Sequence, residues 1–154
     1  MGAGIESLVN QQVLKWHAEA RAADTSSTQP EICVQRPMIT IARECGAMGT
    51  QIGRIVARRL GFDFFDRELV EEVARSAKVQ KVLVELVDDR VQDVISTWIA
   101  EQFGGDTLSP TDYLTNLSRV VLSLGSLGHA VIVGRGAHFI LDPNWTLRVR
   151  ALAP

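Results

Sequence analysis

The chain has 154 residues, of which 46% are hydrophobic and 22% charged, and these are the proportions of a single globular domain with a buried core. A net charge of −2 argues against a general nucleic-acid binder, because such proteins carry a basic surface, but it leaves room for a small basic pocket. Two cysteines without a CxxC pair argue against a disulfide framework or zinc site, and the lack of a long apolar run or signal pattern predicts a cytoplasmic protein without membrane contact.

The N-terminal segment predicts an amphipathic helix over residues 5–22, followed by a polar linker over 23–30 that ends in a proline. The apolar residues of this helix recur at three- and four-residue steps, namely Ile5, Leu8, Val9, Val13, Trp16 and Ala20. This stripe has to be buried, either against its own domain or in a homodimer. We therefore divide the chain into an N-terminal helix and linker, residues 1–36, and a main domain, residues 37–154.

The main domain begins with a strand, because Met38–Ile41 is a short β-branched run. A glycine-containing turn follows, and residues 52–60 then have helical spacing, with Gly61 well placed to end that helix. A second strand at Phe62–Phe65 leads to Asp66, which can cap a further helix.

The middle of the chain predicts helices. Residues 79–103 have a helical pattern, which Gly104-Gly105-Asp106 breaks. Ser109–Asp112 has the residue types of a helix start: a capping serine, a proline in the first turn and an acidic residue at the positive end of the dipole. That helix continues to Gly128, a natural stop.

Two further strands complete the predicted sheet. Ala130–Val133 is entirely apolar, and Trp145–Ala151 alternates arginines with apolar residues. Strands that alternate with helices in this way indicate an α/β fold, in which a three-layer parallel sheet has helices on both faces. Ligands bind beyond the carboxyl ends of the strands in such sheets, and the turns at Gly46 and Gly134 fall at such ends.

The turn Arg43–Thr50 joins a strand to a helix, an arrangement that binds phosphate through backbone N–H groups and the helix N-terminus. A full phosphate loop has a lysine directly before the final Ser/Thr, but here a glycine occupies that place. From spacing alone, the turn is either a phosphate-binding loop or an ordinary connection. As a loop, it would hold the phosphates of a nucleotide with Gly46, Ala47, Met48, Gly49 and Thr50.

Without that lysine, another cation has to stabilise the charge of a transferred phosphoryl group. Arg43 lies inside the turn and is our first choice, with Arg54 as the second. Arg43 can instead be solvated or paired with a carboxylate such as Glu44, which can also help to organise a metal ion. Thr50, at the start of the helix, either ligates Mg²⁺ or caps the helix.

Three segments stand out together: Ile39–Thr50, Leu60–Leu69 and Val131–Ala137. In this order they resemble the cytidylate kinase-like family, relatives of bacterial cytidylate kinases among the P-loop nucleoside monophosphate kinases. That family commonly has an Arg-Glu-x-Gly-Ser-Gly-Gly turn, so the absent lysine looks like a family trait, although Met48 replaces its usual glycine. The resemblance implies a P-loop kinase-like fold and phosphoryl transfer from ATP, with Mg²⁺, to a CMP- or dCMP-like nucleoside monophosphate.

The resemblance also implies residues that bind the acceptor nucleotide. Asp66 falls on a segment that contributes to the monophosphate site in cytidylate kinases, where its carboxylate could accept the exocyclic amine of cytosine; otherwise it is a helix N-cap. Gly134-Arg135-Gly136 is similar to a Gly-Arg-Asp turn whose arginine contacts the bound monophosphate; otherwise Arg135 forms a structural ion pair. Arg43 and Arg135 are therefore the expected catalytic residues, and Gly136, in place of the aspartate, weakens the inference that the base is cytosine.

In the resembling family, a lid that carries arginines and a last strand follow a segment like Leu147–Pro154, where this chain stops. We therefore expect a C-terminally shortened kinase-like domain without the lid, with a helical acceptor-side insertion at about residues 79–110. The alternative is a non-catalytic nucleotide-binding or dimeric scaffold protein with a degenerate phosphate loop.

Overall fold

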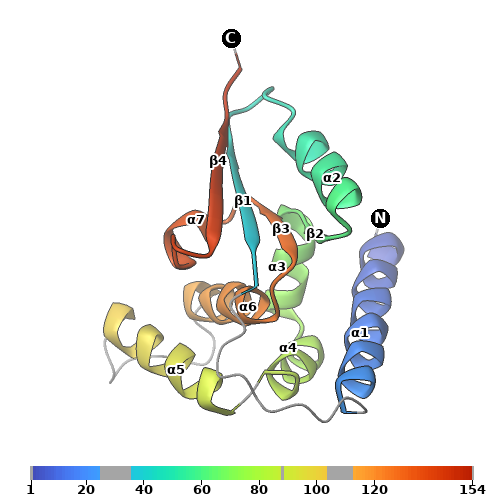
Figure 1. The fold of residues 1–154 in the computed structure, drawn as a ribbon, viewed down its shortest axis with the longest axis vertical. Helices are drawn as coiled ribbons and strands as arrows, with labels where there is room; N and C mark the ends of the chain where they lie inside the picture. Colours follow the sequence, from blue (N-terminus) through green and yellow to red (C-terminus); the bar gives the residue numbers. More distant parts are fainter. Residues whose placement is uncertain (1, 25–35, 88, 104–112, 154) are drawn as a thin grey trace.

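The computed structural model describes residues 2–24, 36–87, 89–103 and 113–153, which form a layered α/β structure (Figure 1). The strands are β1 (Met38–Arg43), β2 (Asp63–Phe65), β3 (Ala130–Val133) and β4 (Thr146–Ala151). The helices are α1 (Gly2–Asp24), α2 (Gly49–Leu60), α3 (Arg67–Arg75), α4 (Ala77–Glu85), α5 (Asp89–Phe103), α6 (Tyr113–Leu127) and α7 (Ala137–Ile140).

The sheet is parallel throughout, as the sequence predicts, with the strand order β2-β3-β1-β4. Central strand β1 pairs with both β3 and β4, so that Ile39 lies opposite Val131 on one side and Leu147 on the other. From β1 the chain crosses toward β2, whereas from β3 it crosses the other way toward β4. The carboxyl ends of β1 and β3 therefore form a topological switch point, the usual place for a ligand in such a sheet.

Helices cover both faces of the sheet, which confirms the predicted three-layer arrangement. On one face α2 packs over Ile39, Ile41, Val131 and Val133. The other face carries α3, α6 and α7, and its core includes Phe65 and Ile132. Figure 1 shows α2 on one side of the sheet and α7 on the other, with α6 below. Successive residues of a strand point to opposite faces, so one apolar strand contributes side chains to the hydrophobic cores on both faces of the sheet.

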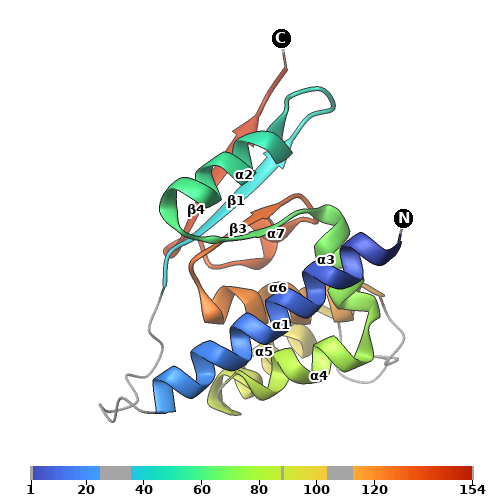
Figure 2. The ribbon, with the colours of Figure 1, turned by 90° about the vertical axis from the view of Figure 1, so that its right-hand side faces the viewer.

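The N-terminal helix packs against its own domain. Figure 2 shows α1 running alongside α3 and α4. Val9 and Trp16, two residues of the predicted apolar stripe, are buried, and the Trp16 ring stacks on Phe65 at a centroid distance of 6.4 Å. These two side chains therefore serve the core of their own chain, and a homodimer through α1 would have to use other residues.

The stretch 79–103 is helical, as the sequence predicts, and it is divided into two helices, α4 and α5. The side chain of Gln92 donates hydrogen bonds to the carbonyl oxygens of Val84 and Val87, at 2.9 and 2.8 Å, and so satisfies backbone groups at the end of α4. Ile95 and Ile99 of α5 then pack in a small apolar cluster of their own. Apolar spacing alone does not reveal such a break.

Other expectations have mixed outcomes. Gly61 and Gly128 follow the ends of α2 and α6 with φ values of +67° and +69°, the left-handed conformation typical of such stops. The four-residue helix α7 was not predicted. The predicted linker after residue 24, the break at Gly104–Asp106 and the start at Ser109–Asp112 lie outside the described residues. No helix within those residues is long and apolar enough to cross a membrane.

Candidate functional site at the sheet switch point

The turn between β1 and α2 leaves the start of α2 open. Its N-cap residue is Met48, in a left-handed conformation with φ 53°, and no side chain caps the helix. Thr50 lies inside the first turn of α2, so the alternative that it is the N-cap is wrong. The turn borders a depression of about 450 Å³ lined by Arg43–Gly46 and Met48–Gln51. Backbone N–H groups without a capping side chain are suited to an anionic ligand.

Arg43 occupies the space that a lysine at position 49 would need. A Cβ atom on Gly49 would lie 2.7 Å from Arg43 Cβ and 3.0 Å from Arg43 Cδ, closer than such atoms approach one another. The stem of Arg43 thus lies against the first turn of α2. The glycine at position 49 and the arginine inside the turn are therefore linked, because the Arg43 side chain lies where a side chain at position 49 would begin.

The second glycine turn has an unusual backbone. Gly134, Arg135 and Gly136 all have positive φ values, of 82°, 56° and 68°. Glycine adopts this conformation freely, whereas for Arg135 it is strained, and strain of this kind concentrates at functional sites. The turn directs the Arg135 side chain toward α3 and α6, where its Nη1 lies 2.5 Å from Glu71 Oε1 and donates to the Tyr113 hydroxyl at 3.3 Å.

The two turns meet at Gly134. Its N–H donates to the carbonyl oxygen of Ile41 at 2.9 Å, and a Cβ atom placed on Gly134 would lie 3.8 Å from Arg43 Nη1. Within the described part of the chain Arg43 pairs with no carboxylate, because Glu44 is bound to Arg150 at 3.1 Å instead. The structure therefore brings Arg43 and the Gly134–Gly136 turn together, as the sequence predicts.

Asp66 is the N-cap of α3. Its Oδ1 accepts a hydrogen bond from the N–H of Leu69 at 3.0 Å, which confirms the capping alternative. Its other oxygen, Oδ2, lies 3.8 Å from Arg54 Nη2. The carboxylate therefore holds α3 with one oxygen and faces α2 with the other, so capping leaves a second acceptor for another partner.

Comparison with known proteins places the chain in a family. The model of the cytidylate kinase-like family matches residues 38–154. The chain belongs to the cytidylate kinase-like family. One similar solved structure, of an uncharacterized protein from Eubacterium ventriosum, shares 20% sequence identity with a TM-score of 0.40, covering 76% of this chain and 53% of that one. This chain thus spans about half the length of that protein. The comparison with curated proteins found no match to this chain.

Members of the cytidylate kinase-like family are nucleotide kinase-like proteins. In this member, the sequence did not reveal three residues that surround Arg135, namely Arg67, Glu71 and Tyr113. Glu71 Oε1 accepts from both Arg135 and Arg67 Nε, the latter at 3.2 Å. Spacing of four residues on α3 could have suggested the Arg67–Glu71 pair. Nothing local links Glu71 or Tyr113 to Arg135, because the fold alone brings these elements together.

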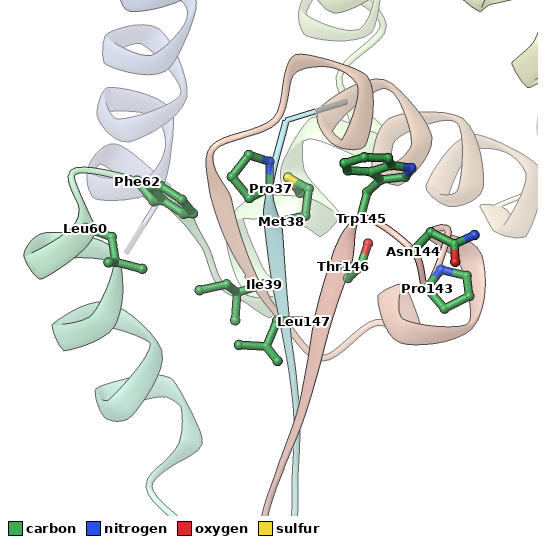
Figure 3. Close-up of a pocket in the computed structure, with 10 residues that line it drawn as sticks. All are labelled: Pro37, Met38, Ile39, Leu60, Phe62, Pro143, Asn144, Trp145, Thr146 and Leu147. Atoms are coloured by element: carbon green, nitrogen blue, oxygen red, sulfur yellow. The ribbon is translucent and has the colours of Figure 1, made fainter. Parts of the chain in front are cut away.

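A second hollow in this cytidylate kinase-like chain lies at the opposite edge of the sheet (Figure 3). It measures about 550 Å³, and Figure 3 shows Leu60 and Phe62 on one side of β1 and Trp145 on the other. None of its ten lining residues is charged. This hollow at the amino ends of the strands has no cation in its lining for a phosphate, so the switch point is the candidate nucleotide site.

Proposed function

We propose that this chain is a phosphotransferase that moves a phosphoryl group from ATP to a CMP- or dCMP-like nucleoside monophosphate. One observation carries the proposal: Arg43 and the Arg135 turn lie at the switch point of the sheet, beside a helix start without a capping side chain. Phosphoryl transfer spreads negative charge over several oxygens, and positioned cations with backbone N–H groups are the features that stabilise it. Family membership agrees with this chemistry.

On the donor side, we assign the phosphates of ATP to Gly46–Thr50, with Arg43 in the role that a loop lysine fills elsewhere. Met48 lines the same depression and is 61% exposed, and the phosphates are assigned to backbone N–H groups of this turn rather than to its side chain. No group of three or more Asp, Glu, His or Cys side chains suited to a metal occurs among the described residues. Thr50 lines the depression at the start of α2, and we assign its hydroxyl as the group that would hold Mg²⁺, an ion that would neutralise phosphate charge.

On the acceptor side, we assign the monophosphate to Arg135. Its guanidinium is already bound by Glu71, and its Nε is a buried donor for which the described residues offer no acceptor. A bound phosphate would compete with Glu71 for the same donors and win by its higher charge and larger number of acceptor oxygens. Asp66 is the proposed contact for the base of the acceptor.

A coupled assay of the full chain with Mg-ATP tests the activity, using CMP, dCMP, UMP and other monophosphates as acceptors. We expect turnover with a pyrimidine monophosphate, reduced by about 100-fold or more in Arg135→Ala, because that change removes charge-assisted hydrogen bonds to the acceptor. Arg75→Ala, an exposed arginine at the last turn of α3, is the matched control and should retain activity. Equal activity in Arg135→Ala and the control would contradict the assigned acceptor site.

The alternative function is a non-catalytic nucleotide-binding or scaffold protein, and the Arg135–Glu71 pair favours it, since this arginine is engaged without any ligand. Calorimetry distinguishes the two functions. Nucleotide binding that depends on Arg43 and Arg135, without turnover for any acceptor, would establish the alternative. A homodimer through exposed residues of α1 is part of that alternative, and light scattering of the chain with and without residues 1–30 tests it.

A further inference from the structure

A pocket of about 480 Å³ separates α1 from α2 and the start of α3. Its lining combines residues of the family-matched domain with residues of α1, which precedes the matched range 38–154. We propose that this pocket receives the base of the acceptor nucleotide, and that α1 determines which base is accepted. This inference rests on the proposed function, because it concerns the acceptor of the same reaction.

Specific contacts hold α1 in place at this pocket. The Gln12 side chain donates to Asp63 Oδ2 at 3.0 Å, and Lys15 pairs with Asp63 Oδ1. The next residue of α1, Trp16, is buried and stacks on Phe65, which lies two residues after Asp63 in β2. A helix fixed by an ion pair, an amide hydrogen bond and a buried aromatic residue forms a defined wall, and a wall held in this way can select a ligand by shape.

The lining has the chemistry of a base site rather than of a phosphate site. Leu8, Phe64 and Leu69 supply an apolar surface for a planar ring. Gln11 supplies an amide with donors and an acceptor, which match the mixed edge of a base, and Gln12 adds its amide oxygen. The lining also holds two cations, but Lys15 pairs with Asp63, and Arg54 lies over the Phe64 ring and 3.8 Å from Asp66, so carboxylates balance the positive charge that a phosphate would need.

Asp66 points one acceptor toward this pocket. Its Oδ1 is used by the N–H of Leu69, whereas Oδ2 lies 3.8 Å from Arg54 Nη2, a separation longer than a hydrogen bond. The Arg54 guanidinium is in turn placed over the Phe64 ring, 5.3 Å from its centroid. A ring seated here can therefore donate an exocyclic amine to Oδ2 without breaking the cap of α3.

The pocket and the Arg135 cluster lie on two sides of the same helix start. Asp66 and Leu69 face the pocket, whereas Arg67 and Glu71 join Arg135. Both sets of residues come from the start of α3, so one acceptor molecule that passes around this helix start would place its phosphate at Arg135 and its base against α1.

The test separates base binding from phosphate binding in the full chain. Dissociation constants for CMP and for ribose 5-phosphate, which lacks the base, are measured by calorimetry. In Gln11→Trp the new ring fills the pocket, so we expect CMP to bind about tenfold more weakly while ribose 5-phosphate is unaffected. Asn10→Trp adds the same ring on an exposed position of α1 outside the lining and should change neither constant. In Gln11→Glu, which only accepts hydrogen bonds, the preference for CMP over UMP should rise severalfold.

The outcomes are distinct. Unchanged CMP affinity in Gln11→Trp, or the same affinity for CMP and ribose 5-phosphate in the unmodified chain, would overturn the inference. Both results leave the proposed function intact as long as Arg135→Ala still weakens both ligands. Failure of the unmodified chain to bind either ligand would instead count against the proposed function itself. Thermal unfolding of each variant shows that the exposed substitutions leave the fold in place.

Discussion

Two helices begin at the same edge of the sheet and differ in how their first turns are satisfied. Helix α3, after β2, has Asp66 as a side-chain cap and Glu68 in its first turn. Helix α2, after β1, starts from Met48, with no capping side chain and no acidic residue in its first turn. Unpaired N–H groups and a partial positive charge occur at every helix start. The chain itself neutralises them at α3, whereas at α2 they remain available to an anion.

Arginines accentuate this contrast. Arg43 lies along the first turn of α2 and reaches Gly134, so a cation is added where the helix is already positive. At α3, by contrast, Arg67 is bound by Glu71. Among the described residues no carboxylate pairs with Arg43, so the positive charge at the start of α2 favours a polyphosphate ligand. We therefore propose that the donor nucleotide binds at α2 and that α3 contacts the acceptor through side chains.

Among the changes that compare the two helix starts, the largest effect is expected from Arg43→Ala. Charge-assisted hydrogen bonds contribute roughly 1.5–3 kcal/mol each, so ATP affinity should fall by about 10- to 100-fold. Arg59→Ala, an exposed arginine in the last turn of α2, is the matched control, with ATP affinity expected to stay within about twofold because only long-range charge is lost. An equal loss in both variants, measured by calorimetry, would mean that ATP responds to general charge rather than to the start of α2.

Gly49→Lys restores the ordinary lysine of a phosphate loop and should nevertheless weaken ATP binding, by about tenfold. The new Cβ would meet Arg43 Cβ at 2.7 Å, so the arginine has to leave its position, and the turn has to shift with it. The double variant Arg43→Ala/Gly49→Lys should recover part of this affinity, since it removes the conflict. Tighter ATP binding by Gly49→Lys alone would contradict the assigned role of Arg43.

Smaller effects on stability compare the two helix starts directly. Asp66→Ala should lower the free energy of unfolding by about 1 kcal/mol, the usual value for a lost N-cap, whereas Asp66→Asn should retain most of it. Thr50→Ala, by contrast, should cost less than about 0.5 kcal/mol, since Thr50 does not cap α2. Urea denaturation gives these values. A loss in Thr50→Ala as large as in Asp66→Ala would show that α2 is capped after all.

The smallest effect is expected from Met48→Gly. Glycine relieves a left-handed strain of roughly 1 kcal/mol, but it also loses more backbone entropy on folding, by about 0.5–1 kcal/mol. Unfolding free energy should therefore change by less than about 0.5 kcal/mol. ATP affinity should be retained, because the Met48 side chain is largely exposed. A clear loss of affinity would show that this side chain touches the nucleotide.

Much of the architecture follows from local sequence. Apolar strands such as Ala130–Val133, and stops such as Gly61, are specified by neighbouring residues, so the parallel sheet and both glycine turns were predicted correctly. The break between α4 and α5 was missed, because the Gln92 side chain that satisfies the backbone there comes from the following helix. Patterns within one segment carry no information about such a contact.

The candidate site divides in the same way. The residues inside the turns, such as Arg43 and Arg135, were visible from the motifs. Their partners were not, because Glu71 and Tyr113 come from other elements that the fold brings to Arg135. The sequence also did not show why position 49 is a glycine, because the reason is the place of the Arg43 side chain against it. Pairings between distant segments require the three-dimensional arrangement.

The most direct test of the central claim, that α2 is the anion-binding helix start and α3 is not, is an NMR titration of the ¹⁵N-labelled 16.9 kDa chain with ATP and Mg²⁺. Backbone amide shifts of Gly49 and Thr50 should move strongly, because we assign the phosphates to these N–H groups in the uncapped first turn of α2, while those of Leu69 and Val70 in the capped α3 should move little. Larger shifts at Leu69 and Val70 than at Gly49 and Thr50 would contradict the account.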